Sequence, residues 1–353
     1  MNSIIHQNCV AIPSIHSNNK REEMATTVNS AFCEFLKNTV NLDPDDTSTA
    51  RASRDNLISN INKFSGDDDF FNVYTDYNLM YGSFARHTKI RPLDDIDLML
   101  CFSASNDGER RTYITDINSI HIVGIGFDRC NSLLTDGTEY LNSTKVINRL
   151  ISKIGNLNDY RKAEMHKNQE AATLQLKSYT WNYDLIPCFY TDSGFYLIPD
   201  GKGDWKKTDP RIDNERTSRL NQKHKGKLLD VIRLMKYWNN RKVTIRIPSY
   251  LLECMILSVY ENLNEKNNYW VDLELRDLFK ALSSAIIYQV PDPKGFQGDL
   301  NSFSFQDRIK ISSALSNAYN KAKEASTLEA TDQKAAINKW REVLGSSFPE
   351  YSD

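Results

Sequence analysis

Three things are missing from this sequence: a long hydrophobic run, a cysteine motif and an excess of charge of one sign. No part of its 353 residues approaches the roughly 18 consecutive apolar residues that a membrane-spanning helix needs. Residues 1–20 also lack a basic region followed by a sustained apolar one, which is the pattern of a secretory signal. We therefore expect a cytoplasmic protein that does not associate with membranes.

The six cysteines are widely scattered and form no CxxC pair. A disulfide framework or a zinc site needs closely spaced cysteines, so we interpret these residues as reduced thiols, most of them in the core. The 44 basic and 46 acidic residues nearly cancel, to a formal net charge of -2. This balance does not favour binding to long polyanions, but it is compatible with a small anion that a metal ion neutralises.

Hydrophobic periodicity predicts strands in the first part of the chain, after an N-terminal arm at residues 1–25, which are polar and aperiodic. Apolar residues at helical spacing predict helices over about residues 28–40 and within 42–64. From Asn72 the pattern changes, because YNLMYGS and DIDLMLCF are short apolar segments typical of a hairpin-like pair of strands.

After a helix near residues 139–154, the segment EAATLQLKSYTWNYDLIPCFY predicts a strand, a turn and a second strand. A loop punctuated by Gly and Pro follows at 191–215, and from there the pattern is helical to the end of the chain. We assign residues 26–210 to a domain with a mixed sheet and N-terminal helices, and residues 211–353 to a C-terminal helical domain.

Two carboxylates interrupt the apolar strand DIDLMLCF. Because successive side chains of a strand alternate between its faces, Asp95 and Asp97 point the same way, while Ile96 and Leu98 point into the core. Like charges so close destabilise a fold unless cations or hydrogen-bond donors compensate them. A divalent metal site is one explanation, and Mg²⁺ suits it because this ion takes oxygen ligands at sites that handle phosphates. An edge strand with two solvated aspartates is the alternative.

Two further features favour the metal site. Gly82 and Ser83 end a strand and open a helical turn, where the backbone can approach a ligand closely and N–H groups and the serine hydroxyl can bind phosphate oxygens. Asp184 is again a single charge in a strand-like apolar run, WNYDLIPCF. Three strand carboxylates and a phosphate-binding turn make one coherent site.

The Gly82-Ser83 turn, the Asp95-Ile96-Asp97-Leu98 run and Asp184 in its DLIP context together resemble the nucleotidyltransferases of the DNA polymerase beta superfamily. More narrowly, GSFARHTKIRPLDDIDLML, RLMKYWN, IPSYLLE and WREVLGSSFP resemble the bacterial CD-NTases, the cyclic oligonucleotide synthases related to cyclic GMP-AMP synthase. The resemblance implies an α+β fold, in which a polymerase beta-like palm with a mixed sheet and flanking helices is followed by a C-terminal helical lobe, with a nucleotide cleft between them.

The resemblance also implies a role for each residue of the palm site. Asp95, Asp97 and Asp184 would be catalytic and would hold two Mg²⁺ ions, with Mn²⁺ as a substitute. Asp184 would in addition act as the general base or orient the attacking ribose hydroxyl. Gly82 and Ser83 would hold the β and γ phosphates of the donor nucleotide.

Three residues of the helical part match family positions that bind the nucleotide. Lys236 matches a lysine that contacts the triphosphate, although on composition alone it is a solvated helix lysine. Ser249 and Tyr250 match a hydroxyl that meets phosphate and a ring that stacks on the donor base. We place the neighbouring Trp238 in the core, and we interpret His87 as a surface turn residue.

The resemblance predicts a template-independent enzyme that binds ATP, GTP or other nucleoside triphosphates, joins them into a cyclic di- or trinucleotide and releases pyrophosphate. In bacteria such enzymes belong to CBASS antiphage systems, where the product activates an effector protein on another chain. We expect a monomer that needs no DNA activator, because the sequence has no Cys/His cluster of the kind with which animal cyclic GMP-AMP synthase engages DNA.

Two alternatives use the same palm. The first is a nucleotidyltransferase that acts on RNA ends or on a protein or small-molecule acceptor. An RNA-end enzyme needs a basic surface for its acceptor, and the balanced charge counts mildly against that surface. The second is a nucleotide sensor without activity, for which the three aspartates and the Gly-Ser turn would be a cost without a benefit.

Overall fold

A computed structural model describes residues 25–64, 70–103, 105–106, 109–110, 112–116, 119–124, 128–241 and 244–352. Apart from Ala25, the predicted N-terminal arm lies outside these residues. The chain divides into two compact units. The sheet unit comprises Asp43–His87 and Pro92–Asn214, and the helical unit comprises Thr88–Arg91, Glu215–Asp353 and the described part of Met1–Leu42.

The sheet unit is organised around two parallel strands, β2 (Asp95–Cys101) and β9 (Asn182–Tyr190). β1 (Leu79–Tyr81) pairs antiparallel with β2. β9 also pairs antiparallel with β8 (Ala171–Gln175) near its start and with β10 (Tyr196–Pro199) near its end. Both central strands have partners on both sides at Asp97 and Asp184, whereas β1 ends opposite Asp97 and does not extend to Asp95.

Further antiparallel strands extend the sheet. The order β1-β2-β9-β10 continues through β11 (Trp205–Thr208), β6 (Ile120–Ile122) and β5 (Tyr113–Thr115), while β7 (Glu164–Asn168) pairs with β8. β3 (Ser105–Asn106) and β4 (Glu109–Arg110) form a separate two-stranded ladder. Short helical turns lie at η2 (Asn62–Phe64), η3 (Thr75–Tyr77), α3 (Gly82–Ala85), η4 (Asp128–Leu133) and η5 (Asn158–Tyr160).

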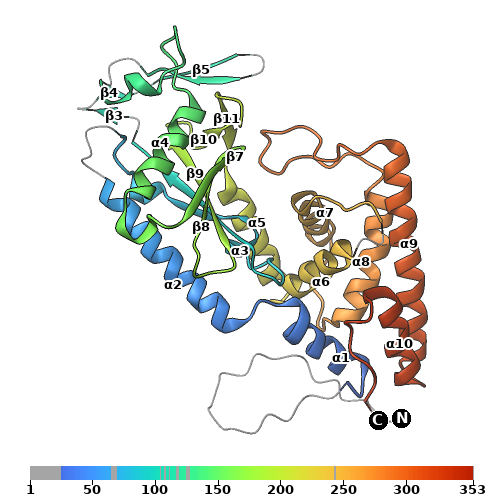
Figure 1. Cartoon of the computed structure of the whole chain (residues 1–353). Helices are drawn as coiled ribbons and strands as arrows, with labels where there is room; N and C mark the ends of the chain where they lie inside the picture. The colour runs from blue at the N-terminus through green and yellow to red at the C-terminus, as the bar shows by residue number, and fades with distance from the viewer. Residues whose placement is uncertain are drawn as a thin grey trace. The chain divides into compact units, whose positions relative to one another are not determined.

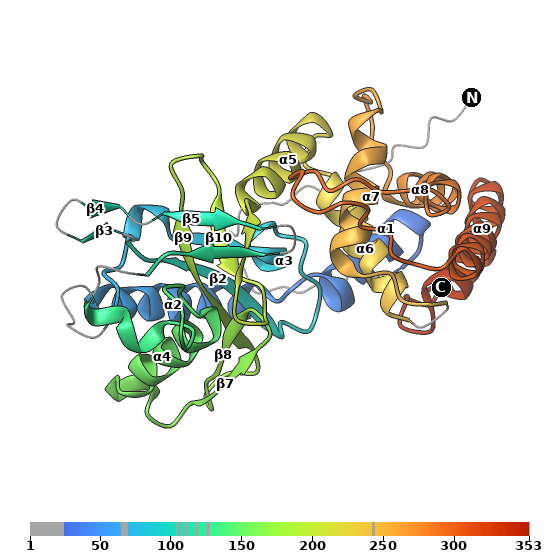
Figure 2. The ribbon, with the colours of Figure 1, turned by 90° about the horizontal axis from the view of Figure 1, so that it is seen from above.

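Two longer helices, α2 (Pro44–Ile61) and α4 (Ser143–Gly155), flank the sheet (Figures 1 and 2). α4 begins where the Asn142 side chain accepts a hydrogen bond from the Lys145 N–H, at 3.1 Å, which satisfies a donor that the first helical turn leaves unpaired. Its apolar stripe, from Val146 to Ile154, is buried against β7, β8, β9 and β10. This packing covers one side of β9, the strand that carries Asp184.

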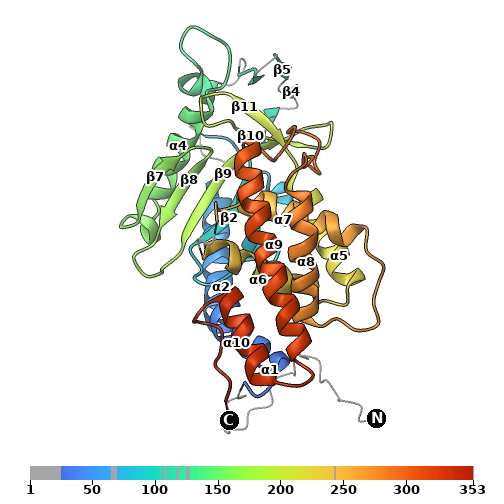
Figure 3. The same ribbon diagram turned by 90° about the vertical axis from the view of Figure 1, so that its right-hand side faces the viewer.

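The helical unit consists of packed helices with one common core. Its members are α1 (Val28–Phe35), the π-helical turn η1 (Leu36–Val40), α6 (Leu228–Asn240), α7 (Ser249–Glu261), α8 (Val271–Ala285), α9 (Phe305–Leu328) and α10 (Gln333–Leu344). Figure 3 shows α8 beside α9 and α10 beside α9. α5 (Pro210–Lys223) starts in the sheet unit and continues into the helical unit.

The first helix groups with the C-terminal helices, whereas the sequence analysis placed it with the sheet. The reason is aromatic packing. The ring of Phe32 lies edge-on to those of Trp340 and Phe348, with both centroids 4.9 Å away, and all three side chains are buried. The Val28 N–H also donates to the Gln333 side chain at 2.8 Å.

Most other predicted elements are confirmed, and the main difference lies at 191–215. The strand pairs β1–β2 and β8–β9 are antiparallel, as expected for the hairpin-like pair and for the strand-turn-strand segment. The segment predicted as a loop instead contains β10, β11 and the start of α5. Gly194, Gly201 and Gly203 adopt positive φ in the turns there, so the glycines that indicated a loop in fact serve tight connections.

No helix within the described residues is long and apolar enough to cross a bilayer. Cys101, Cys130, Cys188 and Cys254 are buried and form no disulfide, as expected for core thiols. Cys9 lies outside the described residues.

The helical unit contains a carboxyl group, that of Glu329, whose ionisation destabilises the folded state. Burial, and then the charge of Asp272, raise the pKa of Glu329 to about 7 from its usual 4.5. The folded state therefore binds this proton more tightly than the unfolded state, so stability is lost as the pH rises through 7. We predict that Glu329→Gln raises the melting temperature at about pH 8 and changes it little at about pH 5. Calorimetry measures both melting temperatures, and equal shifts at the two pH values would contradict the raised pKa of Glu329.

Candidate active site

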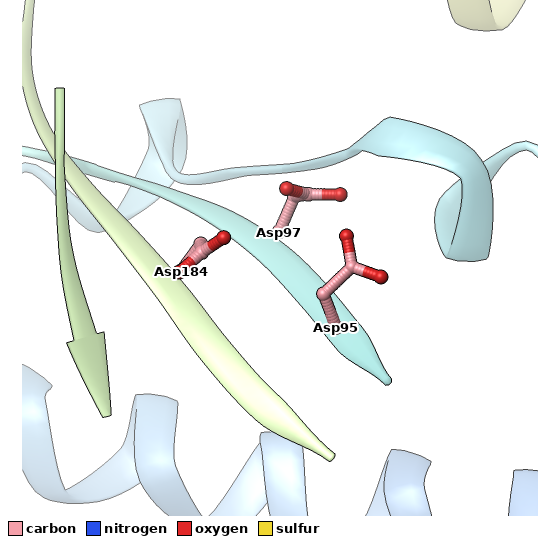
Figure 4. A group of neighbouring side chains, drawn as sticks. All are labelled: Asp95, Asp97 and Asp184. Atoms are coloured by element: carbon pink, nitrogen blue, oxygen red, sulfur yellow. The ribbon is translucent and has the colours of Figure 1, made fainter. Parts of the chain in front are cut away.

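Three carboxylates converge on one face of the central strands. Asp95 and Asp97 lie on β2, Asp184 lies on β9, and the parallel register places Asp97 directly opposite Asp184. Figure 4 shows all three side chains projecting to the same side of the two strands, as strand alternation requires. One oxygen from each carboxylate lies within 4.8 Å of the others, and all three residues are partly exposed.

The strands beneath this face are apolar, which holds the aspartates in place. Ile96 and Leu98 alternate with the aspartates of β2, and each is 1% exposed. Leu185, next to Asp184, is also fully buried. Turning an aspartate away from the common face would require these side chains to leave the core, and burying one such side chain is worth about 1.5–3 kcal/mol.

Gly82 brings the backbone against this cluster. It begins α3 immediately after β1, whose last residue, Tyr81, pairs with Asp97. Gly82 adopts φ +74°, and a Cβ placed on it would overlap the Asp97 carboxylate. Only glycine combines this conformation with so close an approach. Ser83 follows as the second residue of α3 and is partly exposed.

Three further residues beside the aspartates were not predicted as part of the site. The hydroxyl of Thr173, on β8, donates to Asp184 Oδ1 at 2.7 Å. Burial, and then the charges of Asp97 and Asp184, raise the pKa of the Tyr81 phenol well above its usual value, so this side chain stays neutral. Asn182 pairs with Asp95 in the β2–β9 register, and its buried side-chain oxygen has no hydrogen-bond partner.

Sequence signals existed for two of these residues. Tyr81 directly precedes the Gly82-Ser83 turn, and Asn182 lies two positions before Asp184, so it shares a strand face with that aspartate. Thr173 had no local signal, because its partner lies 11 residues away across a hairpin whose register the sequence does not specify.

The donor set fits a hard divalent cation. Three carboxylates from interior strands, with an unpaired amide oxygen next to them, offer only oxygen ligands, which Mg²⁺ and Mn²⁺ prefer. Partial exposure leaves room for the waters that Mg²⁺ usually retains. Among the residues that the structure describes, these three aspartates are the one set of three or more acidic, histidine or cysteine side chains that lie close enough to bind the same ion.

The other three predicted ligand residues lie in the helical unit. The Lys236 ammonium is buried and donates to Glu253 Oε1 at 2.9 Å, with side-chain exposures of 7% and 3%. The Thr88 hydroxyl donates to the same oxygen at 3.1 Å. Lys236 is therefore not the solvated helix lysine that composition alone indicates. Ser249 is the first residue of α7.

Tyr250 is held by the loop that follows α8. Its hydroxyl donates to Asp292 Oδ1 at 3.1 Å, and the Lys294 ammonium lies 4.1 Å from the ring centroid and bonds the same hydroxyl. These contacts fix the orientation of the ring and place a cation over one of its faces.

Trp238 and His87 lie where the sequence predicts, in the core and in a surface turn. Trp238 is 2% exposed, and its ring packs edge-on against Phe279 with the centroids 5.1 Å apart, so it belongs to the core of the helical unit. His87 is an exposed turn residue after α3 with φ +59°.

Comparisons with known proteins show what the chain is similar to. Residues 26–124 match the family model described as the Second Messenger Oligonucleotide or Dinucleotide Synthetase domain. A probable cyclic nucleotide synthase of Bacillus cereus (strain VD146) is 41% identical over 341 residues, which are 94% of this chain and 100% of that protein. A cyclic AMP-AMP-AMP synthase of an Acinetobacter species is 28% identical over 201 residues, 55% of this chain and 57% of that protein.

Solved structures share the fold at low sequence identity. CdnC of E. coli MS115-1, solved with ATP, has a TM-score of 0.66 at 16% identity, covering 91% of this chain and 98% of that one. DncV of Vibrio cholerae, a cyclic AMP-GMP synthase, has a TM-score of 0.64 at 11% identity, covering 93% and 97%. These likenesses confirm the expected α+β architecture of a polymerase beta-like sheet with a C-terminal helical part.

The close approach of Gly82 to Asp97 can be tested through stability. Gly137 has nearly the same φ, +75°, but a Cβ there would meet nothing within 4 Å. We predict that Gly137→Ala costs about 1–2 kcal/mol for its left-handed backbone. Gly82→Ala should cost about 1–3 kcal/mol more, because the methyl group also displaces Asp97. Urea unfolding measures both, and equal losses would contradict the close approach.

Proposed function

This chain belongs to the bacterial CD-NTases, and from its site we propose that it joins nucleoside triphosphates into a cyclic di- or trinucleotide without a template. It is a nucleotidyltransferase and a cyclic oligonucleotide synthase, and the relative that it matches along almost its whole length is a probable cyclic nucleotide synthase. The observation that carries the finer proposal is the convergence of Asp95, Asp97 and Asp184 beside the Gly82 turn.

We propose that Asp95, Asp97 and Asp184 are the catalytic carboxylates and hold two Mg²⁺ ions, with Mn²⁺ as a substitute. The all-oxygen donor set and its partial exposure support this assignment. When bound, such ions supply Lewis-acid stabilisation of the charge that develops in phosphoryl transfer.

The protein groups of the site then have separate tasks in an in-line displacement. The oxygen of a ribose hydroxyl forms a bond to the α-phosphorus of the donor, and the bond to pyrophosphate breaks. Asp184 orients that hydroxyl or takes its proton. The backbone at Gly82 and the Ser83 hydroxyl hold the β and γ phosphates, since this turn begins α3 directly beside the aspartates.

We propose that Lys236, Ser249 and Tyr250 of the helical unit contribute to nucleotide binding, as the family resemblance implies. Lys236 uses one of its three N–H donors on Glu253, so the others are available to a triphosphate. Tyr250, with its hydroxyl tied to Asp292, would offer a preordered ring for stacking on a base.

The substrates are proposed to be nucleoside triphosphates, ATP or GTP among them. One solved structure of CdnC contains ATP, and DncV has been solved with GTP. We further propose that the protein works in the cytoplasm as a monomer in a CBASS antiphage system, without DNA. There its product would activate an effector protein on another chain.

The three aspartates can be tested by their amides. Asp95→Asn combined with Asp97→Asn removes two charges but keeps the shape of β2, so the fold should persist while product formation falls to background. The measurement is mass spectrometry of cyclic products formed from mixed nucleoside triphosphates with Mg²⁺, with circular dichroism as the control for folding. Retained turnover in a folded double variant would remove the site assignment.

The Lys236–Glu253 pair allows a nucleotide contact to be separated from a structural role. Lys236→Met alone leaves the Glu253 charge buried without its partner and should cost about 3–5 kcal/mol of stability. Adding Glu253→Gln should restore most of that stability. We predict that KM for the triphosphate stays raised in the double variant, and a wild-type KM in initial-rate assays would limit Lys236 to a structural role.

A further inference from the structure

One hydroxyl group reaches into the aspartate cluster from outside the two strands that carry it. Thr173, on β8, is 5% exposed, and its Oγ1 lies 2.7 Å from Asp184 Oδ1. We infer that Thr173 is a positioning residue for this reaction, which fixes the orientation of the Asp184 carboxylate. The inference rests on the function proposed above.

The strand register puts Thr173 where it can do this. β8 and β9 are antiparallel, and Thr173 pairs directly with Asp184, so the two side chains stand on the same face of the sheet. The flanking pairs, Ala172 with Leu185 and Leu174 with Tyr183, are all buried. A shift of the register by one residue would bury a polar face, so the threonine hydroxyl is held beside the carboxylate by the core.

The chemistry of the contact fixes its direction. An ionised carboxylate can only accept hydrogen bonds, so the threonine hydroxyl donates its proton to Asp184. A length of 2.7 Å is typical of an O–H donor on a charged oxygen. A threonine side chain has few χ1 rotamers, so its hydroxyl oxygen is already in position before the O–H turns toward the carboxylate.

Asp184 needs such a partner because the last torsion of an aspartate is broad and lets the carboxylate rotate. The bond from Thr173 ties Oδ1 toward β8 and thereby sets the plane of the whole group. β9 lies between β8 and β2, and β2 carries Asp95 and Asp97. The hydroxyl thus orients Asp184 from the side away from the other two aspartates.

A positioning role predicts a specific kinetic pattern. Orientation of Asp184 matters to the attacking hydroxyl and to bound cations, whereas the donor phosphates are assigned to Gly82 and Ser83. Loss of the Thr173 hydroxyl should therefore lower kcat about 10- to 100-fold, as is usual for partners of ligating carboxylates. KM for the triphosphate should change little.

Two comparisons isolate the hydroxyl, Thr173→Val with the unaltered protein and Thr173→Ser with Thr173→Ala. Thr173→Val replaces the hydroxyl by a methyl group of similar size, and Thr173→Ser and Thr173→Ala both lack the threonine methyl but differ in the hydroxyl. We expect Thr173→Val and Thr173→Ala to show the low kcat and Thr173→Ser to keep most of the activity of the unaltered protein. Thr191→Val is the matched control, because Thr191 is also buried at 8% exposure but donates to the Phe195 carbonyl at 2.9 Å.

A second readout does not depend on turnover. Titration with Mn²⁺, followed by electron paramagnetic resonance in the presence of a non-hydrolysable triphosphate, gives the affinity of the cluster for a cation. Thr173→Val and Thr173→Ala should bind Mn²⁺ about 10-fold or more weakly. Thr173→Ser and Thr191→Val should bind it as the unaltered protein does.

The outcomes separate the inference from the function beneath it. If Asp184→Asn is inactive while Val and Ala at position 173 keep normal kcat and Mn²⁺ affinity, the positioning role is wrong and the site stands. If Thr173→Ser loses as much kcat and Mn²⁺ affinity as Thr173→Ala, the hydroxyl is not responsible and the positioning role is also wrong. If Asp184→Asn retains full activity, the proposed site itself fails. Should Thr173→Val not fold, as thermal unfolding would reveal, the comparison of Thr173→Ser with Thr173→Ala alone decides whether the hydroxyl positions Asp184.

Discussion

The mutual repulsion of three carboxylates is the constraint around which the sheet unit is built. Asp95, Asp97 and Asp184 present oxygens within 4.8 Å of one another, and like charges so close are unfavourable unless cations or donors compensate them. The parallel register of β2 and β9 enforces the arrangement, because the residues between the aspartates are committed to the core. The folded chain thus keeps in place a cluster that on its own would spread apart, and so prepares it for a positively charged ligand.

The neighbouring strands serve the same cluster from opposite sides. On one side, β1 ends at Tyr81, and Gly82 brings its backbone against Asp97. On the other, β8 offers the Thr173 hydroxyl to Asp184. The neutral phenol of Tyr81 adds no charge to the group. Regular strands thus support the site on both flanks, and such preorganisation favours catalysis of phosphoryl transfer.

Local patterns predicted the parts of this site that are local. Strand alternation was sufficient to place Asp95 and Asp97 on one face, and the Gly-Ser pair after an apolar strand indicated the turn at Gly82. The meeting of Asp184 with these residues depends on a parallel pairing between strands far apart in sequence, which periodicity cannot specify. We inferred it from a single charge in the apolar run WNYDLIPCF, and the resemblance to a family supported that inference. The ion pair of Lys236 was missed for the same reason, since Glu253 lies 17 residues away on another helix. β10 and β11 were missed because each has only four residues, β11 (WKKT) has no apolar pattern, and the glycines between them indicate a loop.

The central claim is that the three aspartates together hold divalent cations next to a nucleotide. The most direct measurement is anomalous diffraction from crystals grown with Mn²⁺ and a non-hydrolysable nucleoside triphosphate. The account predicts anomalous density in contact with Asp95, Asp97 and Asp184, beside the Gly82 turn. A bound nucleotide with its cations elsewhere, and no anomalous density at these carboxylates, would contradict it.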